Sequence, residues 1–195
     1  MLKEYIEKER NALNELIDVA DGYEEILRLL ASCEGKIVFM GVGKSGHIGK
    51  KLAATFASLG IPAFFVHATE AMHGDLGMIG RKDVALLISN SGNTKEVTQC
   101  VLPLKNNGVT TVAFTAGKDS ELVRLCDHAI IYPKLHEADE LNLAPTVSST
   151  VTLALGDAIA CELSARKGFT RSDFHAFHPN GALGAMLKKE KEENV

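Results

Sequence analysis

Short apolar runs alternate along the chain with longer stretches in which apolar residues recur at helical spacing. The apolar runs have the length of strands and cover residues 36–40, 63–66, 83–88, 110–115 and 128–132. The amphipathic stretches predict helices, most clearly at 48–59, 95–104 and 148–167. Strands that alternate with helices predict a parallel sheet, joined by right-handed crossovers and covered by helices on both faces.

The two ends of the chain carry no motif that suggests chemistry. Residues 1–31 predict two amphipathic helices separated at Asp21-Gly22, which pack on the domain or on a second subunit. Residues 188–195 are mostly charged and predict a flexible tail. A length of 195 residues fits one domain, since roughly 150 residues per domain is the usual prior. We therefore expect a single domain over 1–195.

A loop rich in hydroxyl groups, Ser89-Asn90-Ser91-Gly92-Asn93-Thr94 (the hydroxyl loop), joins the third predicted strand to the next helix. Helix N-termini present unpaired N–H groups and the positive end of a dipole, which favours a bound anion. Ser89, Ser91 and Thr94 add hydroxyl donors, and Gly92 lets the backbone approach a ligand closely. The loop therefore predicts a phosphate site built from neutral donors.

A purely structural interpretation of the hydroxyl loop stays open. Asn93 as N-cap, with Glu96 three residues later, has the pattern of a capping box, which stabilises a helix start without any ligand. Short motifs of this kind also occur by chance, so the loop alone does not decide between a cap and a phosphate site.

A second glycine-rich turn, residues 41–46 (Gly-Val-Gly-Lys-Ser-Gly), follows the first predicted strand. It matches the dinucleotide fingerprint, which also needs an acidic residue about 20 positions later, at the end of the second strand. His67 stands there instead, so a nicotinamide cofactor is not expected. Ligands of parallel sheets bind at the carboxyl ends of strands, near a topological switch point. That rule places Lys44 and Ser45 beside the hydroxyl loop, although Lys44 also fits a solvent-exposed cation.

Other candidate acid–base groups lie in the longer connections. His73 falls between the second and third strands, Glu137 in the connection after the fifth strand, and His178 before a Pro-Asn-Gly turn. Each is compatible with acid–base chemistry in a cleft and equally with a surface loop.

The composition is that of an ordinary globular protein and narrows the classes of function. Hydrophobic residues make up 46% of the chain, and the net charge of −4 gives no basic surface for nucleic acid. The chain has no leader-like segment and no apolar stretch near ~18 residues, so neither export nor a membrane span is expected. The four cysteines form no C-x-x-C pair, which predicts buried free thiols in a reducing cytoplasm rather than disulfides or a metal site.

Five stretches of the chain are specific as a set. They are the turn 41–46, the hydroxyl loop, His-Gly-Asp-Leu-Gly-Met at 73–78, Leu-Ala-Pro-Thr at 143–146 with the Ser/Thr run after it, and His-Pro-Asn-Gly-Ala-Leu-Gly at 178–184. Together they resemble the sugar isomerase (SIS) domain family, and within it the arabinose 5-phosphate isomerases. The resemblance extends from about residue 30 to 187 and implies a flavodoxin-like three-layer α/β/α sandwich with a five-stranded parallel sheet.

The same resemblance implies an activity and its setting. It implies interconversion of D-ribulose 5-phosphate and D-arabinose 5-phosphate through an enediol, with no cofactor and no dedicated metal ion. The product would supply synthesis of Kdo, an acidic sugar of lipopolysaccharide and other bacterial surface polysaccharides. It further implies a cytoplasmic homotetramer whose active sites are shared between subunits, with a sugar phosphate as its ligand.

The resemblance also assigns roles to individual residues. It places catalysis on Lys44, Glu96, Glu137 and His178. It places substrate binding on Gly43, Ser45, His73, Ser89, Asn90, Ser91 and Thr94. Glu137 is the first choice for the base, because a carboxylate enclosed in a cleft can be tuned for proton transfer. His178 would move the proton between the two oxygens and is the main rival for the carbon base, and Lys44 would stabilise the enediolate charge.

The chain departs from the family pattern at three points. Many members carry a C-terminal pair of cystathionine-β-synthase modules, and this sequence ends before such a pair. The turn at 178–181 reads His-Pro-Asn-Gly where His-Pro-Gly-Gly is expected, a mild change because Asn tolerates left-handed backbone. The hydroxyl loop ends Asn-Thr-Lys (93–95) where Glu-Ser-Ser is common, which leaves the sugar specificity open.

Two other functions are compatible with the same motifs. One is a SIS isomerase of a hexulose or heptulose phosphate. The other is a non-catalytic sugar-phosphate sensor, as SIS domains serve in some bacterial regulators. Those regulators carry an N-terminal helix-turn-helix domain, and the roughly 30 residues before the first strand are too few and too acidic for one.

Overall fold

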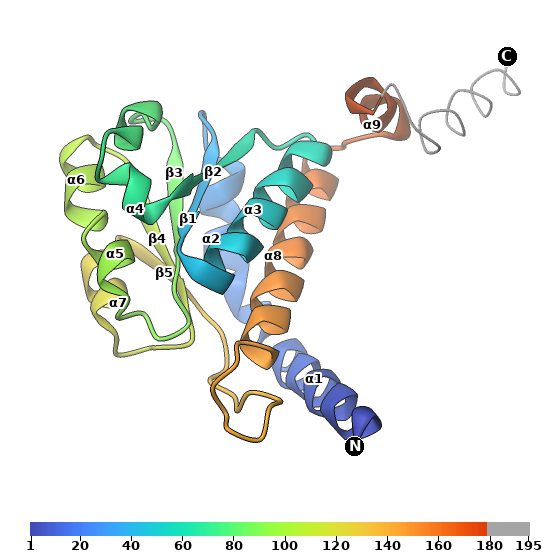
Figure 1. Cartoon of the computed structure of the whole chain (residues 1–195). Helices are drawn as coiled ribbons and strands as arrows, with labels where there is room; N and C mark the ends of the chain where they lie inside the picture. The colour runs from blue at the N-terminus through green and yellow to red at the C-terminus, as the bar shows by residue number, and fades with distance from the viewer. Residues whose placement is uncertain (179–195) are drawn as a thin grey trace, which may run out of the picture.

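A parallel sheet lies between two layers of helices (Figure 1). The computed structural model describes residues 1–178. All pairings between neighbouring strands are parallel, in the order β2-β1-β3-β4-β5. The strands are β1 (Ile37–Gly41), β2 (Ala63–His67), β3 (Val84–Ile88), β4 (Thr110–Thr115) and β5 (His128–Ile131). The predicted five-stranded α/β/α sandwich is thus confirmed.

Helices connect the strands and extend the chain at both ends. The helices are α1 (Leu2–Ile17), α2 (Glu24–Ala31), α3 (Gly43–Ser58), α4 (Ala68–Ala71), α5 (Lys95–Thr98), α6 (Val101–Asn106), α7 (Glu121–Leu125), α8 (Val147–Arg166) and α9 (Arg171–Phe177). Two 3₁₀ turns, η1 (Ala20–Tyr23) and η2 (Asp75–Met78), lie between them.

Each face of the sheet is buried under its own set of helices. Alternate strand residues such as Phe39 and Leu86 pack against α1, α2, α3 and α8. Their neighbours, such as Met40 and Leu87, pack against the layer of α4, α5, α6 and α7. Because side chains alternate along a strand, a strand covered on both faces must be apolar throughout, as β1 and β3 are.

Helix boundaries follow local chemistry, with one difference from the predicted pattern. The helix expected over 95–104 is two short helices, α5 and α6, because Pro103 has no N–H to continue the hydrogen bonding of one helix. Gly60 and Gly168 end α3 and α8 with φ of +77° and +65°, a conformation that favours glycine.

The N-terminal segment forms two helices, as predicted. Ala12 and Leu16 bury one side of α1, and α1 packs against α8. The first half of α1 extends beyond the body of the domain (Figure 1), and Leu2 and Ile6 on it are exposed.

The four cysteines carry no disulfide. Cys100 is buried, as predicted, and burial raises the pKa of its thiol to about 11. Cys161 is exposed on α8, so the prediction of burial is wrong there. It lies in an apolar run, but its position on the helix faces away from the core.

Part of the predicted pattern lies outside the described residues. This holds for residues 179–184 of the His-Pro-Asn-Gly-Ala-Leu-Gly motif and for the predicted tail, 188–195. Within residues 1–178, no helix has both the length and the apolar character needed to cross a membrane.

Candidate active site

The two glycine-rich turns meet at the carboxyl edge of the sheet. β1 and β3 are neighbours, and the chain leaves β1 toward the α3 layer but leaves β3 toward the α5 layer. This reversal opens a crevice at the switch point of a parallel sheet. A Cβ on Gly41 would lie only 3.3 Å from the carbonyl oxygen of Ile88, which shows how closely the two strand ends approach. The predicted proximity of the two turns is confirmed.

Hydrogen bonds among its own residues hold the hydroxyl loop in shape. The Ser89 and Thr94 hydroxyl oxygens are 2.8 Å apart, and the Gly92 N–H donates to Ser89 Oγ at 3.1 Å. The Asn93 N–H donates to Ser91 Oγ at 3.2 Å. Ser89 is buried, whereas Ser91 is exposed and Thr94 is half-buried. Ser89 therefore organises the loop, and Ser91 and Thr94 present hydroxyl groups toward solvent or a ligand.

The capping-box interpretation of this loop is wrong. Thr94 is the N-cap of α5, and its side chain makes no capping hydrogen bond. The Asn93 carboxamide instead accepts from the Glu121 N–H at 3.0 Å and donates to the Ser91 carbonyl at 3.2 Å. The Glu96 carboxylate is exposed and has no hydrogen bond or ion pair with residues 1–178. It is thus available for another role.

Asn90 is anchored to the ends of β4 and β5. Its carbonyl oxygen accepts from the Ala116 N–H at 3.1 Å and from Thr115 Oγ1 at 3.2 Å, both at the end of β4. Its side-chain Oδ1 accepts from the hydroxyl of Tyr132, just after β5, at 3.1 Å.

A small cavity lies between the hydroxyl loop, the turn at residues 41–46 and the start of α8. It has a volume of about 40 Å³ and is lined by Ser45, Ile48, Asn90, Pro145, Ser148, Ser149 and Thr152. It has room for a few water molecules but not for a whole pentose phosphate. Ser148, Ser149 and Thr152 were not among the predicted site residues. Their signal in the sequence is the Ser/Thr run that follows Leu-Ala-Pro-Thr.

Glu137 lies at the same helix start. Its Oε2 accepts from the Thr146 N–H at 2.8 Å and from the Ser148 N–H at 3.1 Å. These N–H groups are among those that a helix N-terminus leaves unpaired, so the carboxylate stabilises α8. Oε1 makes no hydrogen bond within residues 1–178. The structure therefore brings Glu137 to the helix start that lines the cavity with Ser45 and Asn90, with one oxygen fixed and one available.

The turn at residues 41–46 adds an exposed cation. Gly43 begins α3 with φ of +55°, a conformation that favours glycine. Lys44 follows it, exposed and without an ion pair among the described residues. Its ammonium is therefore free to meet a negative charge that enters the crevice.

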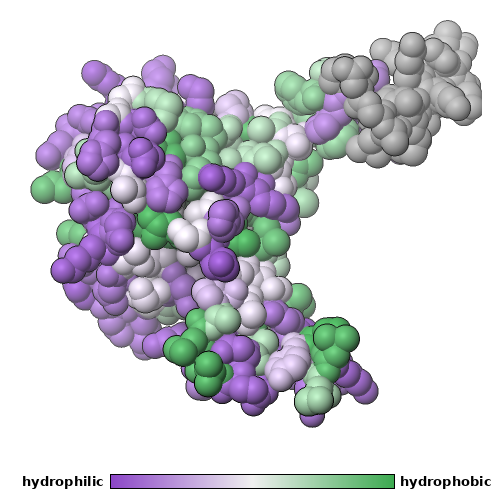
Figure 2. All heavy atoms as spheres, viewed as in Figure 1, coloured by the Kyte–Doolittle hydropathy of each residue, from purple (hydrophilic) through white to green (hydrophobic). Residues whose placement is uncertain are grey.

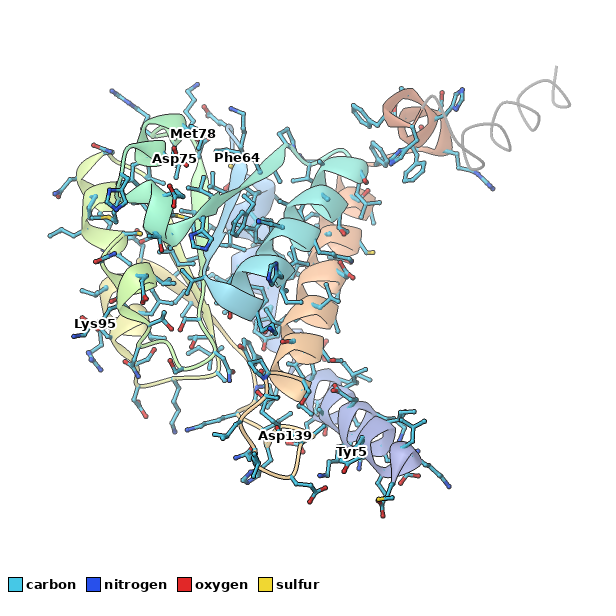
Figure 3. The ribbon with its side chains drawn as sticks, viewed as in Figure 1. Tyr5, Phe64, Asp75, Met78, Lys95 and Asp139 are labelled. Atoms are coloured by element: carbon cyan, nitrogen blue, oxygen red, sulfur yellow. The ribbon has the colours of Figure 1, made fainter. Side chains whose placement is uncertain are left out.

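His73 is not among the residues that line the cavity. It is exposed in the turn after α4, where its N–H donates to the Glu70 carbonyl at 2.9 Å. Figure 3 shows Asp75 and Met78, which continue this connection, at the opposite end of the molecule from Asp139. Asp139 belongs to the connection that carries Glu137.

His178 is likewise distant from the other predicted groups of this chain. It follows α9, which begins beyond the far end of α8 (Figure 1). The 20 residues of α8 span about 30 Å at ~1.5 Å per residue, and Glu137 binds the opposite end. His178 Nδ1 donates to the Phe174 carbonyl at 2.9 Å, which leaves Nε2 unprotonated in the neutral ring.

A larger cleft of about 750 Å³ lies on the other side of the hydroxyl loop. Ser91 and Asn93 form its wall together with Lys118 and Lys134, which follow β4 and β5. These two lysines were not among the predicted site residues, because each stands alone in a connection without a motif.

Comparison with known proteins decides the family. The sequence pattern described as SIS domain matches residues 29–161, well over half of the chain. The chain belongs to the SIS domain family. Arabinose 5-phosphate isomerase KdsD of Escherichia coli K12 is 46% identical to this SIS protein over 186 residues, which are 95% of this chain and 57% of the relative. KdsD of Pseudomonas aeruginosa is 45% identical over 186 residues, again 57% of its length.

A solved structure shows the same fold over nearly its whole length. The Escherichia coli CFT073 protein c3406, in complex with arabinose 5-phosphate, superposes with a TM-score of 0.89 and is 50% identical. The match covers 91% of this chain and 95% of that one. This SIS chain spans a little over half the length of the curated relatives above.

Proposed function

We propose that this SIS domain is an aldose–ketose isomerase that interconverts D-ribulose 5-phosphate and D-arabinose 5-phosphate. The observation that carries the proposal is the meeting of Ser45, Asn90 and the helix start that Glu137 caps at one cavity on the carboxyl edge. That cavity adjoins a loop whose hydroxyl groups suit a phosphate. The relatives named arabinose 5-phosphate isomerase, 45–46% identical, support the choice of sugar.

The phosphate would act as the handle of the substrate. Ser45, Ser91 and Thr94 offer hydroxyl donors to it, and Asn90 and the backbone of Gly43 border the same crevice. Binding energy from the phosphate then holds the first two sugar carbons in register with the base. Ser89 contributes by fixing Thr94.

The reaction moves a proton between two carbons. Glu137 removes the proton from C2 of the aldose while the C1 oxygen gains one, which forms an enediol. The C2 hydroxyl then loses its proton, and C1 receives the proton that Glu137 holds, which gives the ketose. His178 would transfer the proton between the two oxygens, and Lys44 would stabilise negative charge on them. Glu96 would orient the Lys44 ammonium.

This mechanism requires a second copy of the chain. His178 follows α9, and the length of α8 separates it from Glu137 of the same chain. A cavity of about 40 Å³ is also too small for the substrate by itself. We therefore propose a homotetramer in which a neighbouring subunit completes each site, with His73 and His178 as candidates for the contributed groups.

The setting follows from the substrate. Arabinose 5-phosphate made in the cytoplasm would supply synthesis of Kdo for lipopolysaccharide or a related surface polysaccharide. No cofactor or metal ion takes part in the proposed reaction.

A panel of sugar phosphates tests the proposal. Ketose formation is measured with pentose, hexose and heptose phosphates, and we expect turnover of the arabinose 5-phosphate and ribulose 5-phosphate pair above the others. In deuterated water the reacting carbon should exchange its proton with solvent. Preferred turnover of a hexulose or heptulose phosphate would replace the substrate. Binding without any turnover would indicate a sensor, and complete retention of the substrate proton would indicate hydride migration.

A further inference from the structure

Tyr132 is a buried phenol at the carboxyl edge that the proposed mechanism leaves unused. It follows β5 and is 2% exposed. Its N–H donates to the Thr115 carbonyl at 3.1 Å, and its ring meets Phe114 edge to face at 5.8 Å. Packing therefore fixes the direction in which the hydroxyl points.

The hydroxyl crosses the end of β4 and reaches the hydroxyl loop. It donates to Asn90 Oδ1 at 3.1 Å. Burial raises the pKa of Tyr132 to about 12, so the phenol keeps its proton at neutral pH and acts as a donor.

The hydrogen bond from Tyr132 decides which way the Asn90 carboxamide faces. The backbone of Asn90 is already held by Ala116 and Thr115, so the side-chain torsion is the freedom that is left. A carboxamide carries its acceptor and its donor on opposite branches, and with Oδ1 on Tyr132 the NH₂ group points the other way. Asn90 Nδ2 makes no hydrogen bond within residues 1–178, and Asn90 lines the cavity with Ser45.

We propose that Tyr132 is a positioning residue that turns the Asn90 NH₂ group toward an oxygen of the bound sugar phosphate. This inference rests on the proposed function, because the cavity must bind that ligand. Without the phenol hydroxyl, the carboxamide can rotate and present its oxygen to the anion, where acceptor faces acceptor.

The variant Tyr132→Phe removes the hydroxyl and keeps the ring. One neutral hydrogen bond to the ligand is then no longer oriented, so we expect KM and the Kd for arabinose 5-phosphate to rise roughly 3- to 10-fold. We expect kcat to stay within about twofold, since the group acts on binding and not on the reacting carbons.

A double-mutant cycle shows whether Tyr132 acts through Asn90. In an Asn90→Ala background there is no carboxamide to orient, so Tyr132→Phe should change Kd no further. Tyr23→Phe is the matched control, because its hydroxyl is also at the end of β5 and donates to the Ile131 carbonyl at 2.8 Å. It should alter thermal stability at most and leave Kd and KM unchanged.

Each outcome decides the inference. An unchanged Kd in Tyr132→Phe overturns it, and so does an equal loss in the wild-type and Asn90→Ala backgrounds. An equal loss in Tyr23→Phe assigns the effect to packing of the strand end. If the wild type binds arabinose 5-phosphate without turnover, the proposed function fails while Kd still judges Tyr132. If the wild type binds no sugar phosphate, both fail.

Discussion

The Glu137 carboxylate uses one oxygen for structure and has the other free. Oε2 accepts two backbone N–H groups at the start of α8, and Oε1 has no partner within residues 1–178. Glu137→Gln keeps a carbonyl oxygen for the cap but cannot take a carbon-bound proton. We expect kcat to fall by at least ~100-fold, the low end for a general base, with little change in KM. Steady-state kinetics measure this.

The melting temperature of the same variant separates the two roles. It should stay near that of the wild type if the cap survives. Turnover at the wild-type rate would remove Glu137 from the mechanism, and a large loss of stability would assign it to the fold.

Gly92 occupies a position in the hydroxyl loop that no other residue fits. Its φ is +67°, and an added Cβ would lie 2.1 Å from Ser120 Oγ. Gly92→Ala should therefore move the loop away from α7 and raise KM for the sugar phosphate roughly tenfold, because the phosphate handle is misplaced. Kinetics and thermal unfolding measure the two effects.

Gly168→Ala is the matched control for backbone strain alone. Gly168 has φ of +65°, and no heavy atom lies within 4 Å of the Cβ position. It should cost only about 1 kcal/mol of unfolding free energy and leave KM unchanged. Equal effects of the two variants on KM would contradict a special role for the loop.

At the scale of elements, an ion-pair cluster joins α2 to α8. Arg166 contacts Glu24 at 2.7 Å and Glu162 at 2.8 Å, and Arg28 contacts Glu24 at 2.9 Å. Hydrogen bonds from Arg166, then from Arg28, lower the pKa of Glu24 from 4.5 to about 2. A pKa that is lower in the folded state gives stability that is present above pH 4.5 and lost as the pH falls toward 2.

Glu24→Gln should therefore have a lower melting temperature than the wild type near pH 6, and the difference should vanish near pH 2. Because the cluster is exposed, ~1 M salt should reduce the difference at pH 6. Glu34→Gln breaks an ion pair with Lys82, at 3.0 Å, that joins no helices. This control should leave the pH profile as it is. A Glu24→Gln profile parallel to that of the wild type would contradict the assignment.

At the scale of the whole molecule, apolar side chains lie exposed at the end of α1 and on the neighbouring connection (Figure 2). Leu2 and Leu141 are 76% and 75% exposed, and Phe177 on α9 is 60% exposed. Tyr5 and Asp139 mark the contact between α1 and that connection in Figure 3. Large apolar groups in such numbers suit burial against further copies of the chain.

The proposed sharing of sites between subunits predicts complementation. Glu137→Gln and His178→Ala should each be nearly inactive as pure oligomers. After the two are unfolded together and refolded, about a quarter of the sites in mixed oligomers would combine both native groups. Activity should then return toward that fraction.

Light scattering gives the oligomeric state for the same samples. Mixed oligomers that stay inactive would place Glu137 and His178 in one chain's site or outside the reaction. Refolding two portions of the same variant together is the control and should give no recovery.

The order of apolar runs and helical stretches was enough to predict a parallel sheet covered on both faces, because a strand buried on both faces must be apolar throughout. Local rules also held where they depend on adjacent residues, as at Gly60 and Gly168, where a helix ends in left-handed backbone. The same motifs identified the family, and the resemblance to it predicts roles for Lys44 and Glu137.

Contacts across the sheet could not be predicted from the sequence and are known from the folded chain alone. Asn93 pairs with Glu121 rather than capping a helix with Glu96, and Tyr132 reaches Asn90 across the end of β4. The length of α8 separates Glu137 from His178 in one chain, although both belong to the motif set. Sequence patterns report residues close along the chain, whereas these pairings depend on how strands and helices are placed in space.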